Sequence, residues 1–324
     1  MLNPVLRREV RSSLRSWRSF LAISLYVSVG LGVVSVSLSQ SGGMHGFDPR
    51  SAIHIHYFML GFKLFLICLM IPAICAGAIN GERERQTLDL MLITRMSTST
   101  IVAGKLLSSL LFVLLLVAAG LPVFGVLFYY GGFSPIHLVL QIIFIVLTAA
   151  VAGSVAILFS AVFRRPILAI VASYLFMSLL TLGTLVFVAV VHSVLEQAHF
   201  ERISMGGFAF SQFVLPQAWR EAFIWVLAFN PIVGVLSLME NQVGGGIEQQ
   251  FIGMIIGGLF RGISVNIVPD IPFWQMNMAF NAAISAVCVF VAAYIIKPVK
   301  RRAKNNIKVK EKGDGEPGAT SGTA

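Results

Sequence analysis

A dense group of charged residues able to pair with another molecule lies in one stretch, residues 81–105, between two long apolar runs. This stretch carries seven charged side chains, whereas the flanking runs contain only Lys63. A charged side chain costs several kcal/mol in hydrocarbon, so the stretch is expected to lie in water or against a soluble partner. Its mixed charged and apolar groups suit ion pairing and docking.

A helix is the expected form of this stretch. Glu82 and Glu84 near its start favour the positive N-terminal end of a helix. Spacings of three and four residues place a further set on one face, namely Leu88, Met91, Leu92 and Arg95. Such a helix would fit a cleft on a soluble protein. An ordinary cytoplasmic loop, whose charges only set the topology, is the alternative that the residues leave open.

Sequence patterns typical of catalysis are missing. There is no G-x-x-x-x-G-K-[ST], so the chain has no P-loop of its own for ATP, and neither H-E-x-x-H nor G-x-S-x-G occurs. The apolar runs hold almost no acidic residues, which ion-coupled transporters usually place at mid-membrane. Any transport must therefore draw its energy from another chain, and a membrane enzyme is the least favoured hypothesis.

Metal-binding residues are also sparse. The three cysteines all lie in apolar runs without zinc spacing. His45, Asp48, His54 and His56 would suit an external metal site, but a polar loop that happens to contain histidines is the preferred interpretation. No metal ligand is predicted. The remaining histidines, His137, His192 and His199, are expected to be structural.

Composition places these residues in a polytopic membrane protein. Of 324 residues, 57% are hydrophobic and 12% are charged, about half of the roughly 25% typical of soluble domains. The mean hydropathy is +0.85. The net charge of +10 comes from short basic clusters beside apolar runs, which is the positive-inside pattern. Nucleic-acid binding is therefore not expected.

The sequence predicts an all-α membrane protein with six spans. An amphipathic helix over residues 2–19 precedes them; its basic and aromatic groups, Arg8, Arg11, Arg15 and Trp17, are expected at the membrane interface. The transmembrane domain covers residues 1–300, and a basic, disordered cytoplasmic tail covers 301–324. The predicted spans are residues 20–38, 58–79, 101–130, 136–163, 167–195 and 277–296.

Two features of this topology follow from composition. Residues 196–276 are mixed in character and are expected to form an outer re-entrant or surface segment, although residues 222–238 and 249–268 would make eight spans if each crossed. Four clusters, in residues 7–18, 83–105, 164–165 and 297–312, hold 19 of the 24 basic residues. Both termini are therefore predicted to be cytoplasmic.

Three stretches resemble the permease family of type-2 ATP-binding-cassette exporters. They are residues 81–107, which open with Gly-Glu-Arg-Glu-Arg, residues 3–9, which open with Asn-Pro-Val-Leu, and the pair Asn230-Pro231. The resemblance implies an N-terminal elbow helix and a cytoplasmic coupling helix between spans two and three. Gln86 and Arg95 depart from the family pattern, which often has Gly and Pro there.

The resemblance also implies a function. The coupling helix would contact the ATPase subunit through Glu82, Arg83, Glu84, Arg85, Thr87, Leu88 and Asp89. The chain would be the non-enzymatic membrane subunit of an exporter in a prokaryotic plasma (inner) membrane, embedded in lipid, with spans two and five lining the path. Its partners would be a second copy or paralogue, and a separate ATPase that holds ATP and Mg. A membrane scaffold that recruits a soluble partner without transport is the alternative.

Overall fold

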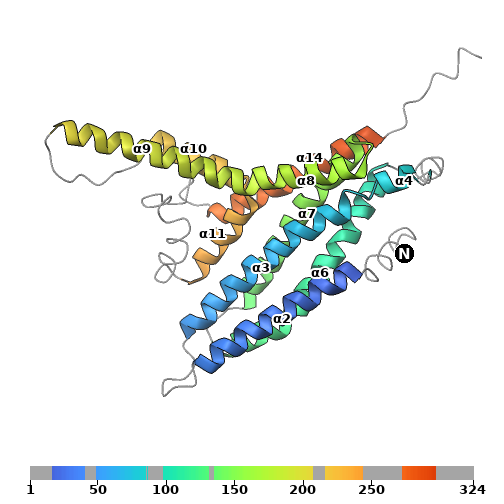
Figure 1. Ribbon diagram of the computed structural model, residues 1–324, viewed down its shortest axis with the longest axis horizontal. Coiled ribbons are helices and arrows are strands. Elements are labelled where there is room, and N and C mark those ends of the chain that lie inside the picture. Colours follow the sequence, from blue (N-terminus) through green and yellow to red (C-terminus); the bar gives the residue numbers. More distant parts are fainter. Residues whose placement is uncertain are drawn as a thin grey trace, which may run out of the picture.

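The computed structural model describes residues 17–40, 49–84, 86, 98–130, 135–206, 216–243 and 272–296, and every regular element within these ranges is a helix (Figure 1). Their bounds are α2 Trp17–Gln40, α3 Pro49–Cys75, α4 Asn80–Glu84, α6 Thr98–Tyr130, α7 Pro135–Val162, α8 Pro166–Ser178, the π-helix η1 Leu179–Gly183, α9 Thr184–Gly206, α10 Gln217–Ala228, α11 Pro231–Val243 and α14 Phe273–Ile296.

Six of these helical stretches are long and apolar enough to cross a membrane, which confirms the all-α fold and the predicted number of spans. Two helices extend further than predicted. α3 begins at Pro49 rather than near Phe58, and the fifth span continues as helix to Gly206 instead of ending at Leu195. The prediction ended each span where polar residues begin, but the backbone hydrogen bonds of a helix need not end there.

The fourth span, α7, is the centre of the bundle. It packs against α3, α6, α8, α11 and α14. Within its apolar window 61% of the residues are buried inside the protein, against 17% for the fifth span, which is formed by α8, η1 and α9. α7 is therefore the helix around which the others pack, while the fifth span keeps most of its surface for other contacts.

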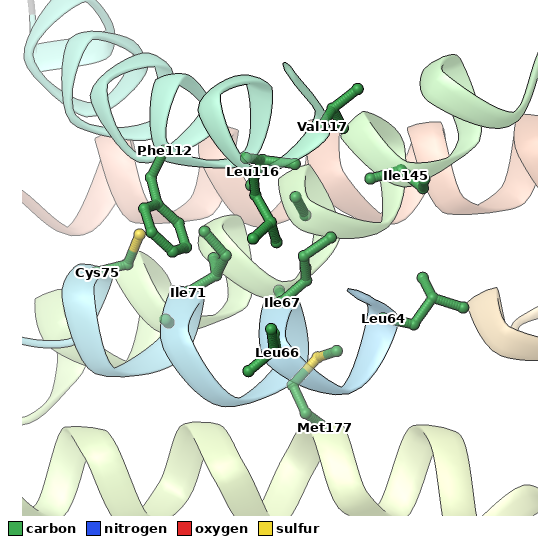
Figure 2. Packing of buried hydrophobic residues seen from close by; sticks show 14 of the residues in the cluster. Leu64, Leu66, Ile67, Ile71, Cys75, Phe112, Leu116, Val117, Ile145 and Met177 are labelled. Atoms are coloured by element: carbon green, nitrogen blue, oxygen red, sulfur yellow. The ribbon is translucent and has the colours of Figure 1, made fainter. Parts of the chain in front are cut away.

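Large aliphatic and aromatic side chains fill the space between α3, α6 and α7. Figure 2 shows Phe112 and Leu116 of α6 beside Ile67 and Ile71 of α3; all four are essentially inaccessible. Gly153 of α7 lets the helices approach, because a Cβ atom there would lie 2.7 Å from Cδ1 of Leu106. Small residues at such positions allow close helix packing in membranes, where the hydrophobic effect does not drive helix association.

The fifth span is a long rod that leads away from the bundle (Figure 1). Its apolar window, Pro166–Phe200, has 35 residues, and at 1.5 Å per residue it measures about 50 Å, well beyond the hydrocarbon thickness of roughly 30 Å. The five-residue π-helix η1 lies in its middle. The rod therefore either tilts strongly or projects from the membrane.

The described part of the outer segment contains a sharply bent helix pair. α10 and α11 meet at Phe229 and Asn230 with a bend of 105°. This geometry belongs to a broken span or a re-entrant loop. It includes residues 222–238, the first of the two possible extra spans; the second, residues 249–268, lies outside the described residues.

Candidate functional site at the basic end of the bundle

Four basic residues near the ends of α4, α6, α7 and α8 lie at one end of the molecule. There the turn after α3 leads into α4, α6 begins, and α7 passes into α8 (Figure 1). We call this region the basic end and define it by Arg83, Lys105, Arg164 and Arg165.

The connection from α3 to α4 is held by a serine of the central helix. The hydroxyl oxygen of Ser160 in α7 accepts hydrogen bonds from the backbone N–H groups of Ile79, at 3.2 Å, and Asn80, at 3.3 Å. All three residues are fully buried. The first N–H groups of a helix have no partner within that helix, and Ser160 supplies one for α4 from a different span. α4 is thereby attached to the core of the bundle.

A second attachment comes from α6. The ammonium group of Lys105 donates a hydrogen bond to the carbonyl oxygen of Ala78 at 2.8 Å and pairs with Oε1 of Glu82 at 2.7 Å. The side chain of Lys105 is only 4% exposed and that of Glu82 is 15% exposed. Because a largely buried charge is unfavourable without its partner, this ion pair holds the start of α6 against α4.

Arg83 makes the third attachment, in which α4 provides the hydrogen-bond donor and α7 the acceptor. Its guanidinium group donates a hydrogen bond, 3.1 Å long, to the carbonyl oxygen of Ala161 near the end of α7. The carbonyl groups of the last turn of a helix lack partners within the helix and carry partial negative charge. Arg83 therefore stabilises the end of α7, whereas the next residue, Glu84, is exposed.

α4 ends in a left-handed turn. Gln86 has φ 54°, and its N–H group donates to the carbonyl oxygen of Arg83 at 3.1 Å. A residue in this conformation commonly follows the last turn of a helix, and it is usually Gly because a Cβ atom is unfavourable there. The turn ends α4 after little more than one helical turn.

A second buried polar cluster lies at the bend between α10 and α11. The side-chain amide of Asn230 donates to Thr184 Oγ1 and to the carbonyl oxygen of Thr181, both at 2.8 Å, in the fifth span. Asn277 of α14 donates to the carbonyl oxygens of Ala228 at 2.8 Å and of Asn230 at 2.9 Å. The cluster satisfies the backbone at the break and joins it to two spans.

These features agree with what comparison with known proteins shows. The sequence model of the ABC-2 family transporter protein matches residues 4–295. The chain belongs to the ABC-2 transporter family. It is thus a multi-pass membrane permease, the non-catalytic membrane subunit of an ABC transporter, and the family implies a partner ABC ATPase. Comparison with curated proteins gives no significant match.

The described coupling residues of this permease have different surroundings. Glu82 and Arg83 contact the permease itself, through Lys105 and Ala161, and Glu84 is the exposed one. The other residues assigned to the coupling helix, Arg85, Thr87, Leu88 and Asp89, lie outside the described residues. Their contact with an ATPase remains a prediction.

The residues assigned to the elbow helix are described in part. Arg8, Arg11 and Arg15 lie outside the described residues. Trp17 is the first residue of α2, is 74% exposed, and has its ring centroid 6.0 Å from that of Phe20. An exposed tryptophan at the start of a span suits the membrane interface, where indole rings are enriched.

Of the residues considered for an external metal site, His45 and Asp48 lie outside the described residues, whereas His54 and His56 belong to α3. Among the described residues, no three His, Cys, Asp or Glu side chains come together as metal ligands would. His56, expected in a polar loop, is instead buried in α3, where its ring lies edge-on to that of Phe124 at 5.4 Å. His56 is compatible with the helix because its ring packs inside the bundle.

Three important residues of the permease were not singled out from the sequence. Ser160 bonds to Ile79, 81 positions earlier, and Asn277 bonds to Asn230, 47 positions earlier. Lys105 pairs with Glu82, 23 positions earlier. Ser160 and Asn277 could have been recognised only as polar residues within apolar runs, since polar side chains in spans usually hydrogen-bond across helices. The pattern gives no information about which partner such a side chain has.

Proposed function

We propose that this permease is the membrane subunit of an exporter and that the segment beginning with α4 docks on a separate ATPase. The observation that carries the proposal is the attachment of α4 to two spans at once, by Lys105–Glu82 to α6 and by Ser160 and Arg83 to α7. A docking segment fixed in this way would pass a displacement of the ATPase directly into the transmembrane bundle. ATP and Mg would be bound in the partner.

The orientation follows from charge. Arg83, Lys105, Arg164 and Arg165 gather at one end of the bundle, and basic residues near span ends stay on the cytoplasmic side. The basic end would then face the cytoplasm of a prokaryotic cell, with both termini on that side. This orientation puts α4 and the exposed Glu84 within reach of a soluble ATPase.

A second permease subunit is expected against the fifth span. An apolar stripe at spacings of three and four residues follows the rod on one side and is between 49% and 70% exposed: Leu168, Val171, Leu175, Leu179, Leu182, Val186, Val190 and Val194. The opposite side, which includes Ala169, Ser173, Met177 and Thr181, is buried in the bundle. Lipid covers such a stripe in a monomer, and a second copy or a paralogue would cover it in a dimer.

The test is a pull-down of the tagged permease from native membranes in mild detergent, followed by mass spectrometry and an ATP hydrolysis assay. We expect a soluble P-loop protein in stoichiometric amount, with hydrolysis stimulated by the permease. Glu84→Arg should weaken both, because Glu84 is exposed and its replacement leaves the internal ion pair intact. The matched control is Glu221→Arg at an exposed carboxylate of α10, a helix that lies away from α4 (Figure 1).

Two results would count against the proposal. If no ATPase co-purifies in any of several detergents, the scaffold hypothesis is favoured over the exporter. If an ATPase co-purifies but its hydrolysis is the same with and without the permease, the two proteins associate without coupling. Equal loss of binding in Glu84→Arg and Glu221→Arg would place the contact elsewhere than at α4.

A further inference from the structure

The fifth span is interrupted in its middle by the π-helix η1, Leu179–Gly183. π-Helical turns are rare, occur mostly as single interruptions of α-helices, and are frequent at functional sites. Side chains bond to the backbone at this interruption. The hydroxyl of Thr181 donates to the carbonyl oxygen of Met177 at 2.7 Å. The hydroxyl of Thr184 donates to the carbonyl oxygen of Leu180 at 2.9 Å. The span is therefore two α-helices, α8 and α9, that meet at a local break.

This break coincides with the border between two hydrophobic clusters. Before η1, Met177 belongs to the main cluster of the bundle. After η1, Val188 belongs to a second cluster, to which α10 contributes Phe223 and Leu227. α9 packs chiefly against α10, and the two helices lead away from the bundle side by side (Figure 1). We call α9 and α10 together the arm. Its packing is largely separate from that of the main bundle.

The arm joins the bundle at its other end through a second break. After α10 the chain bends by 105° at Phe229 and Asn230, and α11 then begins. Asn277 of α14 donates hydrogen bonds to carbonyl oxygens of this bend and so fixes it on the bundle. Helices change direction at π-turns and at prolines, because the regular backbone ladder is already interrupted there. Both helices of the arm therefore connect to the bundle at a place where the backbone can pivot.

Asn230 joins these two breaks to each other. Its side-chain amide donates to the carbonyl oxygen of Thr181 and to the hydroxyl oxygen of Thr184, both at 2.8 Å. Its Oδ1 atom accepts a hydrogen bond from the backbone N–H of Ile232 at 2.9 Å and thereby caps α11. Hydrogen bonds require a defined geometry, whereas the apolar contacts of the second cluster are non-directional. Asn230 thus supplies a directional contact at the point where the arm meets the bundle.

We propose that the arm moves as one unit, pivoting at η1 and at the Phe229–Asn230 bend, and that the side-chain amide of Asn230 is the latch that holds it in the arrangement of this structure. Hinges are commonly a few residues at the ends of elements that absorb the change in backbone angles. A kink of about 20° at η1 would displace Phe200, about 24 Å beyond Thr184, by about 8 Å. The proposal is independent of the docking of an ATPase, because it concerns a part of the molecule away from α4.

The experiment measures distances by double electron–electron resonance in the full chain, reconstituted in nanodiscs. Nitroxides are attached to p-acetylphenylalanine at exposed positions. Labels in place of Val139 of α7 and Phe200 of α9 report on the arm, and labels in place of Val139 and Ile167 of α8 report on the part of the span before η1. An excess of unlabelled chain is produced with the labelled chain, so that each distance lies within one permease. We expect one narrow distribution for each pair.

Two variants remove the latch in different ways. Asn230→Asp keeps the oxygen that caps α11 but has no amide to donate. Thr184→Val removes the hydroxyl that accepts from Asn230 and keeps nearly the same shape. In both variants the distribution between positions 139 and 200 should shift or broaden by about 8 Å, while that between positions 139 and 167 should not change. Because the two variants act on opposite partners, the test remains if one of them does not fold.

Two further variants serve as controls. Ser193→Ala removes a hydroxyl of α9 that bonds within its own helix, to the carbonyl oxygen of Val190, and both distributions should stay narrow. Deletion of Leu182, an exposed residue of η1, removes the residue by which a π-turn exceeds an α-turn and should make the span a continuous α-helix. Combined with Asn230→Asp, this deletion should keep the distribution between positions 139 and 200 narrow.

Three results would overturn the inference. If neither Asn230→Asp nor Thr184→Val alters the distance between positions 139 and 200, the amide is not a latch. If the distances to positions 200 and 167 change equally, the fifth span moves as a rigid rod. If the deletion of Leu182 leaves the effect of Asn230→Asp unchanged, η1 is not the hinge.

Discussion

Lys105 of α6 joins the two ends of the turn that leads to α4, because its ammonium group contacts both the carbonyl oxygen of Ala78 and the carboxylate of Glu82. The pair lies only a few residues into the third span. A movement of α4 must therefore either carry the start of α6 with it or separate two largely buried opposite charges. Separating such charges costs several kcal/mol, so the helices should move together.

This ion pair should be measurable by a double-mutant cycle. Glu82→Gln alone leaves the buried ammonium group of Lys105 without its carboxylate and should destabilise the permease by about 3 kcal/mol. In the double variant with Lys105→Met the loss should be smaller than the sum of the single losses, by about 1–3 kcal/mol. Thermal unfolding at a fixed scan rate in one detergent provides the comparison. The control is Glu84→Gln at the exposed neighbouring carboxylate, with a change below about 0.5 kcal/mol. Additive losses would show that the pair contributes nothing.

Gln86 should be replaceable by glycine with a gain in stability. Its φ of 54° places a Cβ atom in a conformation that glycine adopts without strain. Gln86→Gly should raise the stability of the permease by about 0.5–1 kcal/mol after the entropy of the unfolded chain is taken into account. Gln86→Ala removes the same side chain but keeps the Cβ atom, and it should give no gain. The account is wrong on this point if thermal unfolding ranks the alanine variant above the glycine variant.

Asn277 should be essential for the bend between α10 and α11. In Asn277→Leu the carbonyl oxygens of Ala228 and Asn230 lose their donor in a buried site, and a stability loss of about 2–3 kcal/mol is expected. Asn277→Asp should be worse, because a carboxylate would face the same carbonyl oxygens. Gln275→Leu, at an exposed position two residues earlier, is the matched control and should change the melting temperature little. Similar melting temperatures for all three variants would contradict the assigned role.

Two glycines in neighbouring spans should respond in opposite ways. A Cβ atom at Gly153 would crowd Leu106, so Gly153→Val should cost about 1–3 kcal/mol through overpacking. Nothing lies within 4 Å of the corresponding position at Gly104, and Gly104→Ala should be neutral or stabilise α6 by up to about 1 kcal/mol. Both variants can be compared by thermal unfolding in the same detergent. Equal destabilisation would mean that the packing between α6 and α7 is looser than described.

The number of spans could be predicted because it depends only on local composition. An apolar run long enough to cross hydrocarbon must be helical, whatever its neighbours are. The ends of the helices could not be predicted in the same way. His56 is polar but lies within α3, since its side chain meets Gln141 and Phe124 inside the bundle. Only the tertiary structure supplies those partners.

The candidate site could be predicted only in outline. The charged stretch after the second span identified Glu82, Arg83 and Glu84, and the departure at Gln86 from the usual glycine coincides with the left-handed residue. Which of these three side chains contacts the bundle depends on long-range partners: Arg83 bonds to Ala161, and Glu82 pairs with Lys105. Sequence periodicity contains no information on such pairs, so it could not distinguish inward-facing Glu82 from exposed Glu84.

Site-specific photo-crosslinking in native membranes tests the central claim most directly. A benzoylphenylalanine that replaces Glu84 lies at the exposed end of α4, and the same group in place of Glu221 on α10 is the control. The account predicts that position 84 crosslinks to one soluble protein with a P-loop, identified by mass spectrometry, and that position 221 does not. If that ATPase co-purifies with the permease but crosslinks at position 221 and never at position 84, α4 is not where it docks.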